Sequence, residues 1–532
     1  MSSSTPATPV AQQLVLPWRP VHLIVAAAIA LIGIVLTVTF VRFTIDDAFI
    51  TWRYGDTLIN HGVWGWDPYA APVEAYTNPI YAFGSIIPAL LGIPAEPFFK
   101  LFSFTLFALF VVWVLRQRQV GRWQRLALLA VTVANPVFHI HLWSGLETPL
   151  FVIALTVVFT RLTVQRGLGP LGVALVVVLA LTRPEGIGFA GLAMLWSFGV
   201  ERSWRRFAAG VVTLVVLLVL ALRSTQGLPR LRSLATLDLA PLTPTVFAAA
   251  AAAVALVLNR SSNLLMNYQN RFEWQLVIPV ALVVLAVPPT RRYAPWQALA
   301  VAVTVAAMVS NTSRLGPQVV VLLLIAAIGA ALLWTRRKVA AVLLTAIALV
   351  AATSWFTPGG VLGLATYRGR LEHSHVALAR VLAESPVTNR TLTIGDAGAI
   401  PLVSGWHSVE LYGLANAALA DGEFDADALA ELDPSVLIVT GGAPDKQTGV
   451  PGTINSGLAL SRWYAEEHGF DYLGAMTFRQ EYSLQVYVSP DVDAETRDRI
   501  RQLITSSAEH NDRSDLGYFR FHLFEFPFAR FR

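Results

Sequence analysis

Long apolar runs recur along the first two thirds of the chain and constrain its fold more than any other feature. The first run, residues 21–41, contains no acidic, lysine or arginine side chain and matches the roughly 20 residues with which a helix crosses a bilayer. Of the 532 residues, 55% are hydrophobic and only 14% are charged, whereas a soluble domain carries about 25% charged residues. The sequence therefore predicts a polytopic α-helical membrane protein with about 10–12 spans. The runs are residues 21–41, 79–93, 97–115, 126–142, 148–160, 168–182, 186–200, 208–222, 243–258, 274–288, 296–310, 317–334 and 339–356.

The basic residues are distributed as membrane topology predicts. The net charge is only +5, and arginines gather in short clusters between apolar runs, such as Arg116, Arg118, Arg122 and Arg125. Short loops rich in arginine stay in the cytoplasm. With the N-terminus inside, the first span ends at the outer face and the loop 42–78 lies outside. This pattern explains the positive charge without nucleic-acid binding. The chain has no cysteine, which excludes disulfides and thiolate metal sites.

The two ends of the chain differ from the apolar part. Residues 1–20 are rich in Ser, Thr, Pro, Ala and Gln and predict a disordered cytoplasmic tail. No small-residue cleavage site follows the first run, so we expect a retained span rather than a removed signal peptide. Residues 21–356 hold the predicted spans. The short run at 79–93 contains Pro88, which favours a re-entrant or broken helix.

After residues 357–360, Thr-Pro-Gly-Gly, runs of membrane length stop and charges become frequent. Short β-type runs alternate with helical patterns, so residues 361–532 predict an extracytoplasmic α/β domain. Its aromatic tail, residues 517–526, fits a docked strand or a segment at the membrane interface. The β-type runs are 391–394, 436–440 and 484–488, and the helical patterns are 372–384 and 458–468.

An aspartate pair, Asp46 and Asp47, directly follows the first predicted span. Carboxylates next to hydrocarbon are costly, so an ionisable pair there is a candidate functional site. Desolvation at this boundary raises the pKa of a carboxyl group, which suits a general base. Neighbouring residues of a helix point in different directions, so one aspartate can face a substrate and the other a metal, an arginine or a backbone amide. The alternative is a polar helix end that caps the next helix.

The segment after the pair is polar, aromatic and rich in turns, which favours a substrate-handling loop over a simple connector. It contains Arg53 and, further on, Glu74, Tyr76 and Asn78 in the run Glu-Ala-Tyr-Thr-Asn-Pro.

A second polar cluster, residues 143–149, joins two apolar runs and places Glu147 at a membrane boundary. His139 and His141 precede this cluster by about one helical turn or less. These side chains are candidates for a substrate site. The alternative is an ordinary turn in which the carboxylate of Glu147 caps the following helix.

Two arginines near apolar runs are candidate phosphate ligands, because a guanidinium binds phosphate through two parallel hydrogen bonds. Arg183 stands beside Glu185 in the segment 181–186, so the two could equally form a structural ion pair. Arg271 lies in the polar and aromatic segment 267–274 at the start of a span, where the alternative is a topological anchor.

In the C-terminal part, the turn Gly395-Asp396-Ala397-Gly398 follows a predicted strand. It could bind a ligand, or it is a tight strand-to-helix turn. The three-glycine spacing of a dinucleotide-binding site is missing. Trp406 stands among polar residues, next to His407 and near Glu410, and could stack on a sugar.

Taken in order, these segments resemble the polyprenyl-phosphate-sugar-dependent, multi-span glycosyltransferases of the GT-C fold. Among them, the likeness is greatest to the actinobacterial arabinofuranosyltransferases that add terminal β-linked arabinofuranose to cell-wall arabinan. Each segment alone is weakly specific, and the ordered set is more specific for the fold than for the sugar. The segments are 46–50 with Arg53 and Tyr54, 74–79, 144–149, 182–186, 395–398 and 410–414.

The resemblance implies that the catalytic carboxylate is an aspartate of the first extracytoplasmic loop, which falls on Asp46 or Asp47. The donor would be a lipid-phosphate sugar such as decaprenyl-phosphate arabinofuranose, whose phosphate Arg183 and Arg271 would neutralise, with Arg53 as a further candidate. The remaining predicted substrate-binding residues are Glu74, Tyr76, Asn78, His139, His141, Glu147 and Glu185.

The resemblance also implies an acceptor, a cell-wall polysaccharide or glycolipid, between the membrane surface and the C-terminal domain. The enzyme would lie in the plasma membrane with its active site on the extracytoplasmic side. Some members of the fold bind a divalent cation (Mg, Mn or Ca) beside the acidic pair, in which case Asp46 and Asp47 would hold it. Relatives often carry a Leu-Pro-Asn-Thr stretch where this chain has Leu228-Pro229-Arg230-Leu231. This departure leaves the transferred sugar open, with polyprenyl-phosphate mannose as the alternative donor.

Two other classes of protein fit the composition. A lipid or glycan transporter would place ionisable residues near the midplane of the membrane, often in repeated halves, whereas the notable charges here lie at the ends of apolar runs. A non-catalytic scaffold would not need the aspartate pair. Both alternatives are disfavoured by the positions of the acidic residues.

Overall fold

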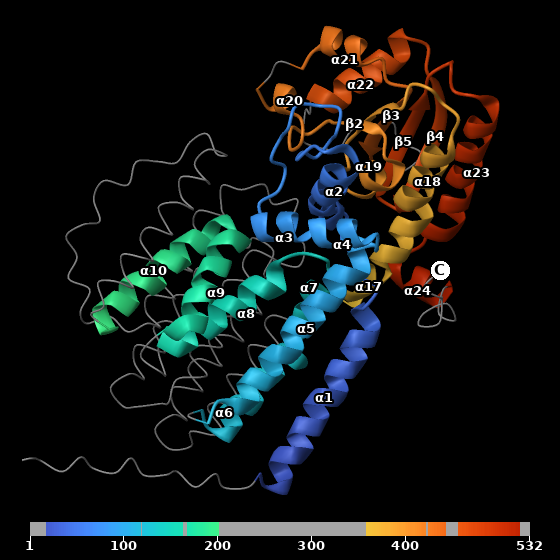
Figure 1. The fold of residues 1–532 in the computed structure, drawn as a ribbon. Coiled ribbons are helices and arrows are strands. Elements are labelled where there is room, and N and C mark those ends of the chain that lie inside the picture. The colour runs from blue at the N-terminus through green and yellow to red at the C-terminus, as the bar shows by residue number, and fades with distance from the viewer. Residues whose placement is uncertain are drawn as a thin grey trace, which may run out of the picture.

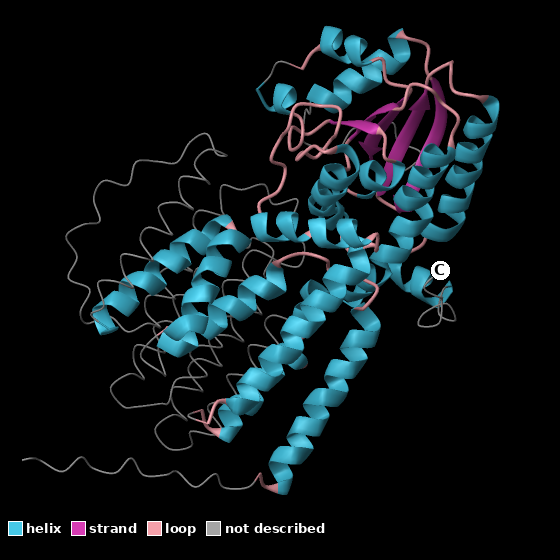
Figure 2. Ribbon diagram, viewed as in Figure 1, coloured by secondary structure: helices cyan, strands magenta, loops and turns pink. Residues whose placement is uncertain are grey.

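The structure is a computed structural model that describes residues 18–118, 120–162, 168–201, 358–421, 424–442 and 456–521. The helices between residues 18 and 201 form an elongated helical part, and an α/β domain built from residues 358–521 sits at one end of it (Figure 1). Strands occur only in this second part among the described residues, as the colouring by secondary structure shows (Figure 2).

Two described helices, α1 (Pro20–Phe40) and α5 (Ala95–Arg116), are long and apolar enough to cross a membrane. Helices α6 (Arg122–Val133) and α7 (Pro136–Trp143) meet at a bend of 55° and pass the same test as one broken span. These helices agree with the predicted membrane protein. The predicted number of spans depends largely on residues 202–357, which lie outside the described part of the chain.

The other helices of this part are shorter. The run at 79–93 is broken into α3 (Pro79–Gly84) and α4 (Ile86–Leu91), which meet at the buried Ser85. Helices α8 (Thr148–Thr160), α9 (Gly169–Thr182) and α10 (Pro184–Glu201) pack against one another. Helix α2 (Asp46–His61) lies between this bundle and the α/β domain.

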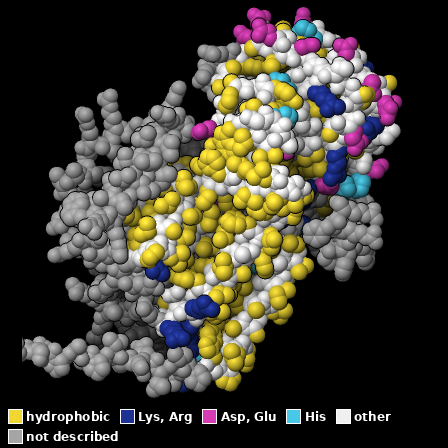
Figure 3. All heavy atoms as spheres, viewed as in Figure 1, with side chains coloured by type: hydrophobic (Ala, Val, Ile, Leu, Met, Phe, Trp, Pro, Cys, Tyr) yellow, Lys and Arg dark blue, Asp and Glu magenta, His cyan; other side chains and the backbone are white. Residues whose placement is uncertain are grey.

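Apolar side chains cover the outside of α1 and α5, where a water-soluble helix would be polar. This arrangement is the one expected of helices that face lipid, and Figure 3 shows the apolar atoms running over these helices. The exposed apolar residues of α1 include Leu23, Ile24, Leu31, Ile34 and Val35, and those of α5 include Leu101, Phe104 and Leu109.

The visible acidic and basic side chains are distributed differently. Basic atoms lie at the end of the helices away from the α/β domain and also on that domain, whereas the acidic atoms lie mostly on the domain (Figure 3). The basic end contains Arg116, which closes α5, and Arg122, which opens α6.

The α/β domain contains one five-stranded sheet with strand order β2-β1-β3-β5-β4. Strand β1 (Thr391–Ile394) pairs in parallel with β2 (His407–Glu410) and β3 (Val436–Gly441). Strands β4 (Asp471–Arg479) and β5 (Tyr482–Val488) form an antiparallel hairpin, and β5 also pairs with β3. The predicted strands at 391–394, 436–440 and 484–488 are confirmed, whereas β2 and β4 were not predicted.

Helices cover both faces of the sheet. Alternate residues of β3 point to opposite faces: Val436 and Ile438 join the core under α18 (Ala377–Glu384) and α23 (Ala494–Asn511), and Leu437 and Val439 join the core under α21 (Ala426–Leu432) and α22 (Ser456–Glu467). Burial on both faces explains why β3 is apolar along most of its length. The short helix α20 (Ala417–Asp421) completes the second layer.

Two helices join the domain to the helical part. Helix α17 (Pro358–Leu371) continues through a π-helical turn, η4 (Glu372–Val376), into α18, and contacts α1. Helix α19 (Ala399–Ser404) lies against α2 (Figure 1). The tail residues Asp515–Phe521 form helix α24, which packs on α17, so the prediction of a docked strand is wrong for these residues.

Candidate functional site

The aspartate pair opens helix α2 at the boundary with the α/β domain. Asp46 and Asp47 lie in the first turn of α2, where their negative charges interact favourably with the helix dipole. Asp46 reaches across to the turn before α19: its Oδ2 accepts a hydrogen bond from the Gly398 amide (3.1 Å) and its Oδ1 from the Ala399 amide (2.8 Å). Contacts between residues more than 350 positions apart thus bring the predicted acidic pair and the predicted Gly-rich turn together.

Gly398 permits this contact because it has no side chain. A Cβ atom at this position would lie 2.2 Å from both the backbone oxygen and the carboxylate of Asp46. Any other residue would therefore push the turn away from the start of α2.

The same turn carries a third carboxylate, Asp396. Its Oδ2 lies 2.7 Å from Nε2 of His375, which comes from η4, and its Oδ1 accepts a hydrogen bond of 2.6 Å from the hydroxyl of Tyr482 on β5. Asp46, Asp47, His375 and Asp396 are called the junction cluster below.

Burial sets the acidity of the junction cluster. Desolvation raises the pKa of Asp46 from 3.8 to about 7, although the charge of His375 and the amide of Ala399 act in the opposite direction. Burial alone would lower the pKa of His375, but its hydrogen bond to Asp396 and the charges of Asp396 and Asp46 raise it. The site therefore holds a carboxyl group that can gain or lose a proton near neutral pH, as a general base requires.

Tyrosines surround these charges. Desolvation raises the pKa of Tyr367, from α17, and of Tyr482 well above the ordinary value, and the nearby carboxylates add to the effect. Both phenols are therefore neutral at physiological pH, and Tyr482 donates its hydrogen bond to Asp396. Tyr367 also packs edge-on against Phe43 and Phe478.

A further contact set ties the span α5 to α17 close to the pair. Thr44, two residues before Asp46, donates a 2.6 Å hydrogen bond to Glu96 at the start of α5. Glu96 also binds Lys100 (2.9 Å) and Arg368 (3.3 Å).

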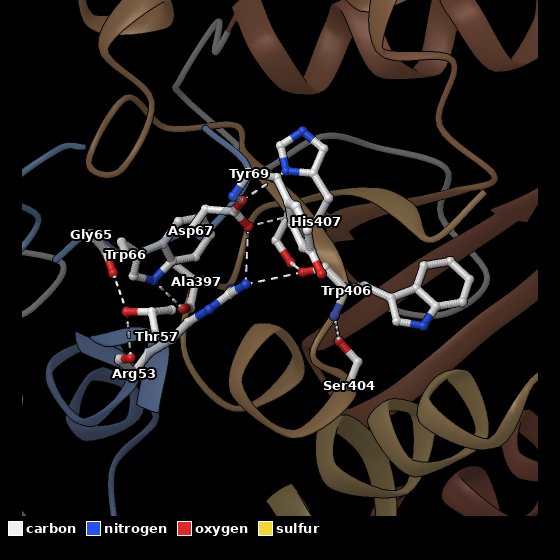
Figure 4. A network of polar contacts seen from close by, with 11 residues as sticks. Arg53, Thr57, Gly65, Trp66, Asp67, Tyr69, Ala397, Ser404, Trp406 and His407 are labelled. Atoms are coloured by element: carbon white, nitrogen blue, oxygen red, sulfur yellow. Dashed lines mark hydrogen bonds and ion pairs between the residues drawn. The ribbon is translucent and has the colours of Figure 1, made fainter. Parts of the chain in front are cut away.

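Arg53 lies in a clamp between α2, the following loop and the α/β domain (Figure 4). Its Nη2 donates 3.0 Å hydrogen bonds to Asp67 and to the carbonyl of Trp406, and its guanidinium lies 4.6 Å from the ring centroid of Trp66. Asp67 in turn accepts from His407 Nδ1 and from the Ser408 amide, both at 2.8 Å. The contacts made by Arg53 thus hold the extramembrane loop on the domain.

The hydrogen bonds of Asp67 determine its charge. Burial would raise the pKa of this carboxyl, but the bond from His407 and the charge of Arg53 outweigh it and lower the pKa. Trp66 adds a hydrogen bond from its indole to the Ala397 carbonyl (3.2 Å), so the clamp also holds the turn of the junction cluster. Trp406 is fully buried, and its indole bonds to the Leu382 carbonyl, so the prediction that Trp406 stacks on a sugar is wrong.

Four of the predicted site residues meet in a second cluster, called the glutamate cluster: Asn78, Glu147, Arg183 and Glu185. Glu147 is fully buried; its carboxylate accepts from Asn78 Nδ2 and from Arg183 Nη1, both at 2.6 Å. Arg183 also binds Glu185 at 3.1 Å. Although Glu147 occupies the N-cap position of α8, it makes no side-chain capping bond.

The remaining predicted residues lie apart from both clusters. Glu74 is exposed on the loop, and Tyr76 packs edge-on against Tyr54 at 4.7 Å between ring centroids. His139 and His141 are buried in α7, where His139 bonds to the Val133 carbonyl at 2.8 Å. Arg271 lies outside the described residues.

The described residues do not fit a divalent cation at the aspartate pair. Among them, no group of three or more His, Asp or Glu side chains is arranged to hold a metal ion. No step of the chemistry below is therefore routed through a metal.

Sequence reasoning missed His375, Tyr367 and Tyr482. Asp396 was identified only as part of a Gly-rich turn. The sequence does contain a signal for His375. Two histidines stand in the polar run Glu372-His373-Ser374-His375, whereas the residues that follow in the predicted helix are mostly apolar.

Comparison with known proteins gives matches to part of the chain and to solved structures. The profile described as a domain of unknown function (DUF8728) matches residues 365–493, which include His375, Asp396 and Tyr482. No curated protein sequence matches the chain.

Two solved structures are similar to the chain, both of ArnT from Cupriavidus metallidurans. The apo state is 15% identical over 90% of this chain and 98% of that one, with a TM-score of 0.47. The state bound to undecaprenyl phosphate is 15% identical over 87% and 97%, with a TM-score of 0.42. Since both scores lie below 0.5, the proposed function does not depend on this likeness.

Proposed function

We propose that the protein is a membrane glycosyltransferase of the GT-C type that moves a sugar from a polyprenyl-phosphate donor to a glycan acceptor at the junction cluster. The observation that carries the proposal is Asp46, a carboxyl with a pKa near 7 that opens helix α2 shortly after the candidate span α1 and is held by two amides of the α/β domain. A lipid-linked donor and a water-soluble acceptor can meet only at such a boundary. The resemblance of the ordered sequence segments supports the same class.

In the proposed reaction, an acceptor hydroxyl oxygen bonds to C1 of the sugar while the bond from C1 to the phosphate oxygen breaks. The lipid leaves as a phosphate monoester, and the hydroxyl proton passes to Asp46. Each carboxylate oxygen has two lone pairs and uses one on an amide, so Asp46 keeps capacity to accept this proton. Asp47 supplies negative charge to the oxocarbenium-like transition state.

The leaving phosphate needs positive charge, and Arg183, Arg271 and Arg53 remain the proposed ligands. Arg183 and Arg53 are each bound to carboxylates in this structure. Either would have to exchange a carboxylate for the phosphate when the donor binds. The predicted substrate contacts also stay proposals: Glu74, Tyr76, Asn78, His139, His141, Glu147 and Glu185.

The favoured donor is decaprenyl-phosphate arabinofuranose, and the favoured acceptor is a cell-wall arabinan or glycolipid; a polyprenyl-phosphate mannose donor is the alternative. We place the enzyme in the plasma membrane with the junction cluster outside. The basic connection between α5 and α6 lies at the opposite end of the helices and would face the cytoplasm.

The test is a transfer assay with purified protein in nanodiscs, offered synthetic decaprenyl-phosphate arabinofuranose or polyprenyl-phosphate mannose and a short arabinan or mannan acceptor. We expect product from one donor with the wild type and its loss in Asp46→Asn or Asp47→Asn protein of unchanged thermal stability. No product from any lipid-phosphate sugar would contradict the proposed class, and full activity in both variants would contradict the proposed site.

A further inference from the structure

The α/β domain brings a buried histidine to the aspartate pair that the proposed mechanism does not use. His375 lies in η4, a π-helical turn inserted between α17 and α18. Such turns are rare, add one residue to a helix, and often occur at functional sites. Here the turn carries the His375 side chain, which is 2% exposed, to Asp396.

The hydrogen bonds around the ring determine its protonation. The hydroxyl of Ser374 donates its single hydrogen to the Arg370 carbonyl (2.7 Å), so toward His375 Nδ1, 3.0 Å away, Ser374 can only accept. His375 Nε2 faces the Asp396 carboxylate, which already accepts from Tyr482 through its other oxygen. With a carboxylate at Nε2 and a hydroxyl that can accept at Nδ1, each ring nitrogen has an acceptor for a hydrogen, and the carboxylates raise the pKa of His375, so its surroundings favour the imidazolium form.

The His375 side chain lies among several carboxylates. Asp46 and Asp47 come from α2 and Asp396 from the turn after β1, so three carboxylates meet at the junction cluster. Among the described residues, neutral phenols also face it: Tyr367 from α17, Tyr482 from β5 and Tyr412 from the loop after β2. Three adjacent carboxylates repel one another because their charges are alike. A positive charge nearby offsets this repulsion and favours the ionised carboxylates.

We propose that His375 is a positioning residue for Asp46: bound by Asp396, its imidazolium supplies positive charge beside the aspartate pair and fixes the turn whose amides hold Asp46. The proposal rests on the proposed function, because it assigns to Asp46 the role of base. It makes the α/β domain part of the active site rather than only a cover that binds the acceptor.

The first test is His375→Gln, which keeps hydrogen-bonding groups and removes the charge. The turn loosens and Asp46 becomes harder to ionise, so we expect kcat at pH 7 to fall about 100-fold, the loss typical of an angstrom-scale displacement of a catalytic group. KM for the donor should change little, and the acid limb of the kcat profile should move to higher pH, so that activity recovers in alkaline buffer.

The matched control is His373→Gln, which removes a histidine from the same π-helical turn. His373 stacks on His510 at 4.2 Å between ring centroids, away from the carboxylates. We expect wild-type kcat and pH profile from this variant. Equal losses in the two variants would show that only the helix was disturbed and would overturn the proposal, as would a wild-type profile in His375→Gln.

If His375→Gln fails to fold, Asp396→Asn takes its place, because this variant leaves every residue of η4 unchanged. It removes the charge that faces Nε2 and so neutralises His375, but it also removes a charge that raises the pKa of Asp46. We therefore expect a smaller shift of the acid limb in the same direction, and the double variant should be no worse than the more impaired single variant. An unshifted limb in Asp396→Asn would overturn the proposal.

A readout without catalysis separates this proposal from the proposed function. In protein with ¹⁵N-labelled histidine, His375 should show two protonated ring nitrogens at pH 7, and Asp396→Asn should convert it to a neutral ring. A neutral His375 in the wild type would overturn the inference even if transfer is observed. Conversely, a cationic His375 in a protein that transfers no sugar would leave the charge assignment standing and reject the proposed function.

Discussion

Two acidic clusters differ in how their charges are balanced: the glutamate cluster around the fully buried Glu147, and the junction cluster of half-buried aspartates at the start of helix α2. In the glutamate cluster, Arg183 binds both Glu147 and Glu185, and Asn78 occupies the second oxygen of Glu147. In the junction cluster, His375 faces Asp396, and Asp46 is bound by two neutral amides. The first arrangement is typical of a structural ion pair, whereas the second leaves a carboxyl that exchanges its proton near neutral pH. Balance of charge, more than burial, separates a candidate reactive site from a structural one.

The comparison predicts the largest effect on rate at Asp46. Asp46→Asn keeps the size of the side chain and removes the base, so transfer should fall by about 10² to 10⁴, the usual contribution of general base catalysis. The measurement is kcat in nanodiscs together with the unfolding midpoint on the same sample.

The matched control is Asp56→Asn, which changes an aspartate almost three turns further along α2 that accepts a hydrogen bond from Asn60. We expect near-normal transfer from it. If Asp46→Asn loses stability in proportion to activity, the junction cluster is structural and the comparison fails.

The glutamate cluster should respond in stability. Arg183→Met leaves Glu147 buried without its cation, so we expect a loss of about 3–5 kcal/mol in the free energy of unfolding. Chemical denaturation in mild detergent would measure it, with the exposed Arg118→Met as the control that should change little.

A different outcome would redefine the glutamate cluster. If Arg183→Met keeps its stability but raises KM for the lipid donor, Arg183 acts as the phosphate ligand that its position in the sequence predicts. The two clusters would then be halves of one active site.

Gly398→Ala tests the contact between the turn and Asp46. The new methyl group would fall 2.2 Å from the Asp46 carboxylate and displace it, so transfer should drop about 100-fold, as for other misplacements of about 1 Å. Gly188→Ala is the control, because a Cβ there meets no atom within 4 Å. Wild-type transfer from Gly398→Ala would show that the amide contact is dispensable.

The dependence of kcat on pH should be the smallest of the predicted effects. The base must be ionised, and its pKa is about 7, so kcat should fall about tenfold for each pH unit below that value. The folded pKa lies above the ordinary 3.8, so the folded state binds this proton more tightly, and the carboxyl's contribution to stability is lost as pH rises from about 4 to about 7. A flat rate profile through this range would contradict the assignment of Asp46 as the base.

The sequence predicted features that depend on local pattern. Apolar length identified the spans α1 and α5, and β-type runs identified β1, β3 and β5. The unusual place of Asp46 and Asp47 after a span was also visible without a structure. These features could be predicted because residues that are neighbours in the sequence are enough to define them.

The missing features depend on distant contacts or on irregular backbone. Strand β4 contains Gly474 at a bulge, which breaks the alternation that predicts a strand. The partner of Asp46 lies more than 350 residues away, so no spacing in the sequence reveals it. His375 lies in a π-helical turn, from which its side chain reaches Asp396. In a regular α-helix the side chain at this position would point in a different direction.

The most direct test of the central claim locates the reacting lipid phosphate. A polyprenyl phosphate with a photoreactive group on its first isoprene unit would be crosslinked to the wild type in nanodiscs, and the adducts mapped by mass spectrometry with and without excess unlabelled lipid phosphate. We predict competed adducts in peptides that contain Asp46, Tyr367 or Asp396. Competed adducts that all lie away from these peptides would contradict the junction cluster as the site of transfer.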